Sequence, residues 1–170
     1  ASVSSQRGVR VYGNTHGFLA GDCGTSHSLS CVLLAQVGED MQRDYWYTSA
    51  RDPRDLEAAE LVGRRAGQRA IARLGARRLP TGPAQVVLAP EVARFIGHFI
   101  GAIRGSAQYR KASFLLGTAG QRIFPDWVQM HERPHLLKGV ASSNFDSEGV
   151  RTVDRELVRD GVVDGYLLGS

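Results

Sequence analysis

Apolar and polar residues alternate over much of the first 50 positions, which is the period of an extended strand. Val9 and Val11 alternate with larger polar side chains, and residues 26–37 enclose a continuous apolar centre that is typical of a well-buried strand. A turn at 38–40 follows, and residues 41–50 return with a Tyr-Trp-Tyr run that favours a pleated surface. The pattern over 7–50 therefore predicts antiparallel strands, with glycines at turns and bulges. These glycines are Gly13, Gly17, Gly21 and Gly24.

The spacing of apolar residues changes to three and four after residue 52, which predicts a helix over 53–75. Asp52-Pro53 is a typical helix start, because the carboxylate caps the first turn and proline is tolerated there. One apolar stripe results, made of Leu56, Ala59, Val62, Ala66, Ala70 and Leu74. The same stretch is rich in arginine, but acids at its start and cations at its end complement the helix dipole. A solvated helix face therefore explains these arginines better than a phosphate-binding stripe does.

A Leu-Pro-Thr-Gly-Pro connector at 79–83 is the best candidate for a domain boundary. It divides the chain into residues 1–79, expected to end an N-terminal α+β domain, and residues 80–170, expected to begin a C-terminal domain that is incomplete. Beyond the connector, residues 85–88 predict a short buried strand and residues 90–104 a second helix. Three glycines fall four apart along that helix and would let another backbone approach closely. They are Gly97, Gly101 and Gly105.

The last part of the chain predicts a hairpin, with strands at 155–159 and 162–168 joined by the turn Asp160-Gly161. Strands at both ends, helices between them and no regular strand-helix-strand rhythm predict an α+β fold with a mostly antiparallel sheet. The chain starts at Ala1 without a methionine and stops just after a strand-like run at 165–168. We therefore expect a fragment, continued by further chain or completed by a partner subunit.

Composition indicates in which cellular compartment the protein is expected. The chain has 170 residues, 42% of them hydrophobic, and a net charge of +4. No apolar run approaches the about 20 residues that cross a bilayer, so we expect no membrane association. Cys23 and Cys31 are too few for a disulfide framework and are not spaced as a metal clip. These features predict a reduced, cytoplasmic protein.

Residues 131–135 spell H-E-x-x-H, the signature of zinc peptidases, with His131, Glu132 and His135 as the candidate residues. That chemistry requires a helix, because only helical spacing puts both histidines on one face toward one metal ion. Pro134 lies inside the motif, lacks a backbone N–H and disfavours the helical conformation of Arg133. We therefore expect an extended segment that bends at the proline.

Several stretches together resemble the PmbA/TldD family, which includes bacterial modulators of DNA gyrase and microcin-maturation metallopeptidases. The similar stretches lie at 41–47, 63–66, 79–82, 109–115 and 145–150. The resemblance runs in order over essentially the whole chain. It corresponds to a middle portion of a protein more than twice this length.

The resemblance implies a heterodimer in which a TldD-like subunit carries H-E-x-x-x-H on a helix and binds zinc. Laid on this chain, the first histidine of that motif falls at Gly97, its glutamate at His98 and its second histidine at Ala102. Glycine and alanine have no donor atom, and histidine cannot replace a carboxylate as base. The resemblance thus implies no catalytic residue, metal or other cofactor in this chain, and leaves its own enzymatic activity uncertain.

The family resemblance suggests the non-catalytic subunit of a zinc metallopeptidase that processes or degrades unfolded or modified peptides. Zinc and general base would come from the TldD-like partner. Two alternatives stay open: a self-sufficient zinc peptidase that uses the 131–135 motif, and a regulator that binds DNA gyrase or DNA.

Overall fold

The computed structural model describes residues 1–168 and has an α+β fold with two antiparallel sheets. The chain forms two compact units, Ala1–Thr81 with Leu136–Ser143, and Gly82–His135 with Asn144–Ser170. The short segment 136–143 therefore belongs to the first unit although both of its neighbours along the chain belong to the second. None of the helices in the described part of the chain combines the length and hydropathy of a membrane span.

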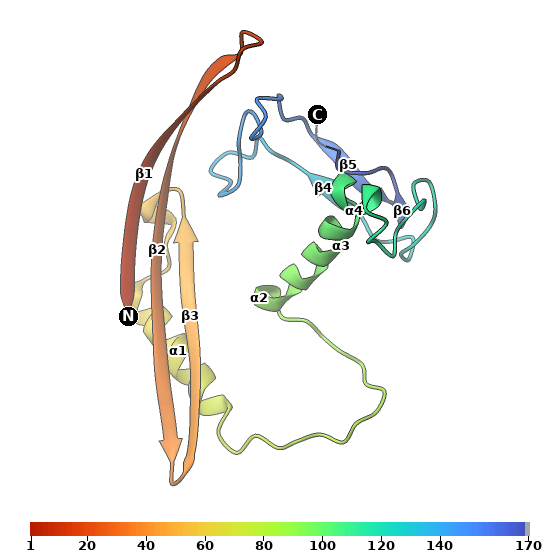
Figure 1. The fold of residues 1–170 in the computed structure, drawn as a ribbon. Coiled ribbons are helices and arrows are strands. Elements are labelled where there is room, and N and C mark those ends of the chain that lie inside the picture. The colour runs from red at the N-terminus through yellow and green to blue at the C-terminus, as the bar shows by residue number, and fades with distance from the viewer. Residues whose placement is uncertain (169–170) are drawn as a thin grey trace. The chain divides into compact units, whose positions relative to one another are not determined.

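The first unit is built on one antiparallel sheet of strand order β1-β2-β3 (Figure 1). The strands are β1 (Ser2–Gly13), β2 (Leu19–Val37) and β3 (Asp40–Ala50), which confirms the strands expected over 7–50. Between β1 and β2, the Asn14 side-chain oxygen accepts hydrogen bonds from the backbone N–H groups of His16 and Phe18. Gly17 has a positive φ of 86° there, a conformation that glycine adopts at little cost.

Strand β3 pairs with β2 only from His27 onward, so residues 6–13 and 19–26 form a two-stranded ribbon beyond the rest of the sheet. The register of this ribbon is unbroken, with Gly8 opposite Gly24 and Val11 opposite Gly21. The bulges expected at Gly21 and Gly24 are therefore wrong. Both glycines are regular strand positions.

Helix α1 (Ala59–Ala72) packs on β2 and β3 and buries Val62, Ala66 and Ala70, which confirms the apolar stripe (Figure 1). The helix expected over 53–75 is nevertheless interrupted. Asp52 caps a separate 3-10 turn, η1 (Pro53–Asp55), and Leu56 then takes an extended conformation. The backbone N–H of Glu57 donates to Thr48 Oγ1 of β3, so this part of the chain bonds to the sheet instead of continuing a helix.

Among the described residues of the first unit, helix α1 covers one face of the sheet. Leu33 lies against Gly67 of α1, whereas Val32 and Leu34 are 52% and 66% exposed. The expectation of a well-buried strand at 26–37 is wrong, because none of these residues is buried and even Leu33, which faces α1, is 38% exposed.

Residues 81–89 contain no helix or strand, and the buried strand expected at 85–88 is wrong. Val87 is 97% exposed. A strand needs a neighbour for its backbone hydrogen bonds, and none of the described strands pairs with this segment.

The second unit combines short helices with a three-stranded sheet of order β4-β5-β6. Its elements are α2 (Pro90–Ala93), η2 (Arg94–Ile96), α3 (Gly97–Ala102), α4 (Gly105–Tyr109), β4 (Met130–Glu132), β5 (Arg155–Arg159) and β6 (Val162–Val163). The core contains Phe99, Ile103, Leu115, Leu157, Val158 and Val163. The rings of Phe99 and Phe124 form a T-shaped, edge-to-face pair with 5.0 Å between their centroids.

The hairpin predicted near the C-terminus is confirmed at its turn, where Asp160 and Gly161 have φ values of 50° and 75°. Its second strand is shorter than the expected 162–168 and ends at Val163. Leu167 instead pairs with Arg104 in a parallel bridge, and its backbone N–H donates to Ile103. The end of the described chain therefore ties the hairpin to the segment between α3 and α4.

Candidate functional site

The three positions onto which the resemblance lays the zinc motif, Gly97, His98 and Ala102, lie on one helix, α3. The helix expected over 90–104 is present as α2, η2 and α3 in succession, and it ends at Ala102 because Ile103 and Arg104 leave the helical conformation. His98 Nδ1 lies 2.9 Å from the backbone oxygen of Phe95, and the two rings are 5.2 Å apart. Gly97 and Ala102 present no donor atom in their side chains.

The glycines expected to form one close-packed stripe have different surroundings. A methyl group at Gly97 or Gly101 would meet nothing within 4 Å among the described residues, so this face of α3 is open. Gly105 belongs to α4, and its backbone N–H donates to Leu167 O at 2.7 Å. The expected close approach of another backbone is therefore found at Gly105 alone.

A hollow of about 290 Å³ lies beside α3. Its lining is aromatic and aliphatic apart from one histidine: Phe95, Ile96, His98, Phe99, Phe114, Ile123 and Phe124. Such a surface accepts an apolar side chain or another apolar surface. Sequence reasoning missed it, because Phe114, Ile123 and Phe124 reach α3 only through the tertiary fold.

The H-E-x-x-H spelling at 131–135 is extended through Glu132 and then turns at Pro134 and His135, which confirms the expected segment that bends at the proline. Its first residues form strand β4, so His131 and Glu132 point to opposite faces of the sheet. His131 Nδ1 lies 3.8 Å from Glu156 Oε1, and Glu132 pairs with Arg155.

His135 Nε2 lies 3.0 Å from Thr152 Oγ1, so His135 contacts a different residue from the one that His131 contacts. The two histidines therefore do not share the helical face that the zinc signature needs. Within residues 1–168, no group of three or more His, Cys, Asp or Glu side chains is arranged to hold a metal ion.

Two arginines of α1, Arg65 and Arg69, and Arg73 just after it are directed at the sheet, whereas Arg64 is exposed. Arg65 and Arg69 lie 5.1 and 5.3 Å from the centre of the Trp46 ring, a cation–π arrangement. Arg69 and Arg73 each reach the buried carboxylate of Asp44 at 3.4 Å. These side chains serve the packing of α1 on β3, and the expected solvated face is only partly right.

Asp44 is 7% exposed and is the buried charged residue among the described positions. The Tyr45 backbone N–H, together with the Arg69 guanidinium, holds the pKa of this carboxyl below its usual value, although burial acts in the opposite direction. Sequence reasoning missed Asp44. The signal was the alternation over 41–50, which puts Asp44 on the same face as Trp46 and toward α1.

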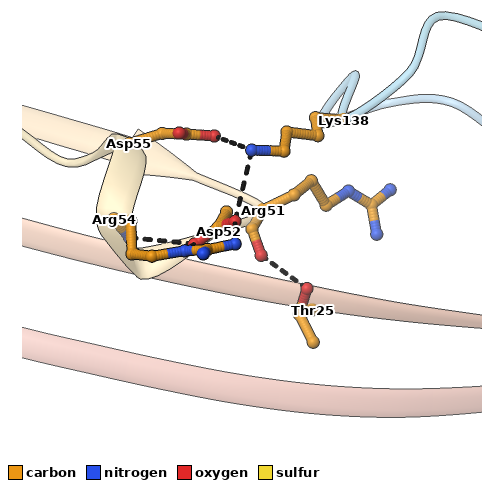
Figure 2. A network of polar contacts seen from close by, with 6 residues as sticks. All are labelled: Thr25, Arg51, Asp52, Arg54, Asp55 and Lys138. Carbon is orange, nitrogen blue, oxygen red and sulfur yellow. Dashed lines mark hydrogen bonds and ion pairs between the residues drawn. The ribbon is translucent and has the colours of Figure 1, made fainter.

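A second polar cluster lies where segment 136–143 meets the end of β3 (Figure 2). Lys138 Nζ lies 2.7 Å from Asp55 and 3.2 Å from Asp52, and the two carboxylates raise the pKa of its ammonium group. Arg54 contributes most to holding the pKa of Asp52 far below the usual range, and Lys138 adds to the effect. Thr25 Oγ1 donates to the backbone oxygen of Arg51 at 2.6 Å.

Comparison with known proteins identifies both parts of the chain. The model of the PmbA/TldA metallopeptidase central domain matches residues 1–74, and that of the PmbA/TldA metallopeptidase C-terminal domain matches residues 81–170. The chain is 49% identical to Metalloprotease PmbA of Escherichia coli O157:H7 over 170 residues, which are 99% of this chain and 38% of the relative. The chain thus spans about two fifths of the length of this relative.

Solved structures share the fold. A Bacteroides thetaiotaomicron protein named as a candidate modulator of DNA gyrase superposes with a TM-score of 0.91 and 29% identity over 96% of this chain and 38% of its own. TldE from Thermococcus kodakarensis superposes with a TM-score of 0.74 and 18% identity over 98% of this chain and 38% of its own, a likeness of fold. Two family models match the chain in order, and a curated relative is 49% identical to it. The chain therefore belongs to the PmbA/TldD family of metallopeptidases.

Proposed function

We propose that this chain is part of the non-catalytic subunit of a heterodimeric zinc metallopeptidase in the cytoplasm. The partner is a TldD-like subunit that supplies zinc and the general base, and the substrates are unfolded or modified peptides. One observation carries the proposal: where the family's zinc motif would place two metal ligands and a base, helix α3 has Gly97, Ala102 and His98.

This chain would contribute scaffold and part of the wall around the substrate. The apolar hollow beside α3 suits an apolar side chain of an extended peptide. The open face at Gly97 and Gly101 leaves room for a peptide or for the partner subunit. Strands β1 and β3 are the edges of their sheet, where an extended peptide can add main-chain hydrogen bonds.

The two alternatives fit the geometry less well. A self-sufficient zinc peptidase would use His131, Glu132 and His135, but the first two lie on strand β4, His135 lies in the following turn, and the two histidines contact different residues. A DNA-binding regulator would need a row of arginines directed at phosphates, whereas Arg69 and Arg73 are directed at Asp44. The other exposed arginines of this stretch are Arg64, Arg77 and Arg78.

The test is to purify the intact protein and a TldD-like subunit separately, without chelators, and then to combine them. Zinc content is measured by mass spectrometry and hydrolysis with an unfolded peptide. We expect zinc and activity only when the TldD-like subunit is present, and the double variant His131→Ala/His135→Ala should leave the activity of the pair unchanged. Stoichiometric zinc and hydrolysis by this protein alone, both lost in the double variant, would establish the self-sufficient peptidase instead.

A further inference from the structure

Residues 136–143, here called the strap, connect the two units in an unusual way. The strap packs with the first unit, while residues on both sides of it belong to the second. The chain therefore passes between the units three times, at 81/82, 135/136 and 143/144. If the strap stays bound to the first unit, all three crossings connect the units; if it detaches, only the crossing at 81/82 does.

Arg51, just after β3, binds the strap through its guanidinium. Its Nε donates to Gly139 O at 3.2 Å, and its Nη2 donates to Val140 O at 2.9 Å and to Ser142 O at 3.4 Å. The strap is itself turned, since Gly139 N donates to Leu136 O and Ser142 N donates to Gly139 O. One planar side chain thus collects carbonyl oxygens that the turn has brought together.

Lys138 forms the second attachment, on the carboxylates of Asp52 and Asp55 (Figure 2). These are contacts between charges at the surface, since the Lys138 side chain is 49% exposed. Arg10 adds a hydrogen bond to Ser143 Oγ at 2.8 Å. All of the attachments named so far are polar.

Apolar packing contributes little to holding the strap. Leu137 is 94% exposed, Leu136 is 55% exposed and Val140 is 60% exposed. Surface ion pairs stabilise weakly and are screened by salt. The strap is therefore held more weakly than the helix and strands beneath it.

Gly24 of β2 leaves the space that Arg51 occupies. A Cβ at Gly24 would overlap the Arg51 guanidinium, the mobile end of a long side chain, so that a larger residue would displace the guanidinium and not the strand. Gly8, which pairs with Gly24 across the sheet, has nothing within 4 Å of its Cβ position. The two glycines form a matched pair that differs in the contact with Arg51.

We propose that the strap is a releasable clasp that couples the two units. When it is docked through Arg51 and Lys138, the second unit is tethered at both ends of the strap as well as through the segment at 82–89. When it is released, residues 136–143 become a loop of the second unit, which is then tethered through 82–89 alone. This inference does not depend on the proposed peptidase role.

Hydrogen exchange of the intact protein, followed by mass spectrometry of peptides that cover 136–143, tests the clasp. Lys138→Met removes the charge and keeps the alkyl chain, and we expect about two- to fivefold faster exchange in the strap, the range that surface ion pairs provide. Lys111→Met is the control, because Lys111 is exposed and, like Lys138, has a positive φ. Raising the salt concentration should speed strap exchange in the unaltered protein and have less effect in Lys138→Met.

Gly24→Ala provides the second test, with Gly8→Ala as its control. We expect faster exchange in the strap for Gly24→Ala and exchange in α1 and β3 that matches the unaltered protein. Unchanged strap exchange in both Lys138→Met and Gly24→Ala would overturn the clasp. So would exchange that rises equally over the whole first unit, because the strap would then open only when that unit unfolds.

Discussion

At the scale of single residues, Gly161 is the most constrained position in the second unit. Its φ is 75°, and its backbone N–H donates to Val128 O at 3.0 Å. Its own oxygen accepts hydrogen bonds from the N–H groups of Ile123 and Phe124. The turn between β5 and β6 therefore also anchors the chain at 123–128, and a side chain would have to fit among these backbones.

Gly161→Ala should destabilise the second unit by about 1–3 kcal/mol, the usual cost of a residue in a strained backbone conformation. The new methyl group would also lie against the oxygens of Phe124 and Pro125, the latter at 2.6 Å. Denaturant unfolding of the intact protein measures the change. Gly165→Ala is the control, because its Cβ would meet nothing within 4 Å, and equal stability of the two variants would contradict the prediction.

At the scale of elements, the packing of α1 on the sheet depends on charge as well as on apolar burial. Val62, Ala66 and Ala70 are small side chains, so the helix lies close to β3. Asp44 then lies within reach of Arg69 and Arg73. A buried carboxylate costs free energy unless it is paired, and here it also accepts the Tyr45 N–H at 2.7 Å. We therefore expect stability of this unit to depend on pH.

Asp44→Asn should lower the free energy of unfolding by about 1–2 kcal/mol at neutral pH, because two partly exposed arginines lose their counter-charge. The folded protein holds the pKa of Asp44 below its usual value, so the carboxylate's contribution is complete above that value and disappears as the pH falls through the lowered pKa. The difference in the free energy of unfolding between Asp44→Asn and the unaltered protein should thus become smaller below about pH 4.

Denaturant unfolding at a series of pH values measures this difference. Asp22→Asn, on β2 of the same sheet, is the control for removing one carboxylate from this sheet. A difference for Asp44→Asn that becomes larger in acid would contradict the assigned role of Asp44.

The elements that could be predicted from sequence are those fixed by local pattern. The antiparallel strands, the stripe of α1, the turn at Asp160-Gly161 and the extended chain around Pro134 all follow from side-chain period or turn chemistry. Features that depend on distant residues could not be predicted. The segment 85–88 has the composition of a strand, but none of the described strands pairs with it. The hollow beside α3 is lined by Phe114 and Phe124, which are distant from this helix in sequence. Residues 136–143 carry no pattern that links Lys138 to Asp55.

At the scale of the whole molecule, the second unit begins with an irregular segment, 82–89, which follows the first of the three crossings between the units. None of the described helices or strands includes it, and Val86 and Val87 are 74% and 97% exposed. Segments of this kind are the ones that proteases cut first, since their backbone is free to enter an active site.

Limited digestion with elastase should therefore cut first between residues 84 and 89. N-terminal sequencing and intact mass of the first products locate the cut. The turn at Gly38-Glu39 is an internal control, because the pairing of β2 with β3 holds both of its ends and should protect it. A first cut at that turn, or within α1, would contradict the prediction.

The long ribbon of β1 and β2 has a mechanical consequence. Its outer part, residues 6–13 and 19–26, has no third strand, and the facing pair Gly8 and Gly24 leaves one rung without side chains. Six residues of strand, the distance from this rung to the turn, span roughly 20 Å, so a bend of about 10° at the rung would move Asn14–Phe18 by roughly 3.5 Å. Bending at this rung would therefore displace the Asn14–Phe18 turn further than any residue beside Arg51, whose guanidinium occupies the space next to Gly24.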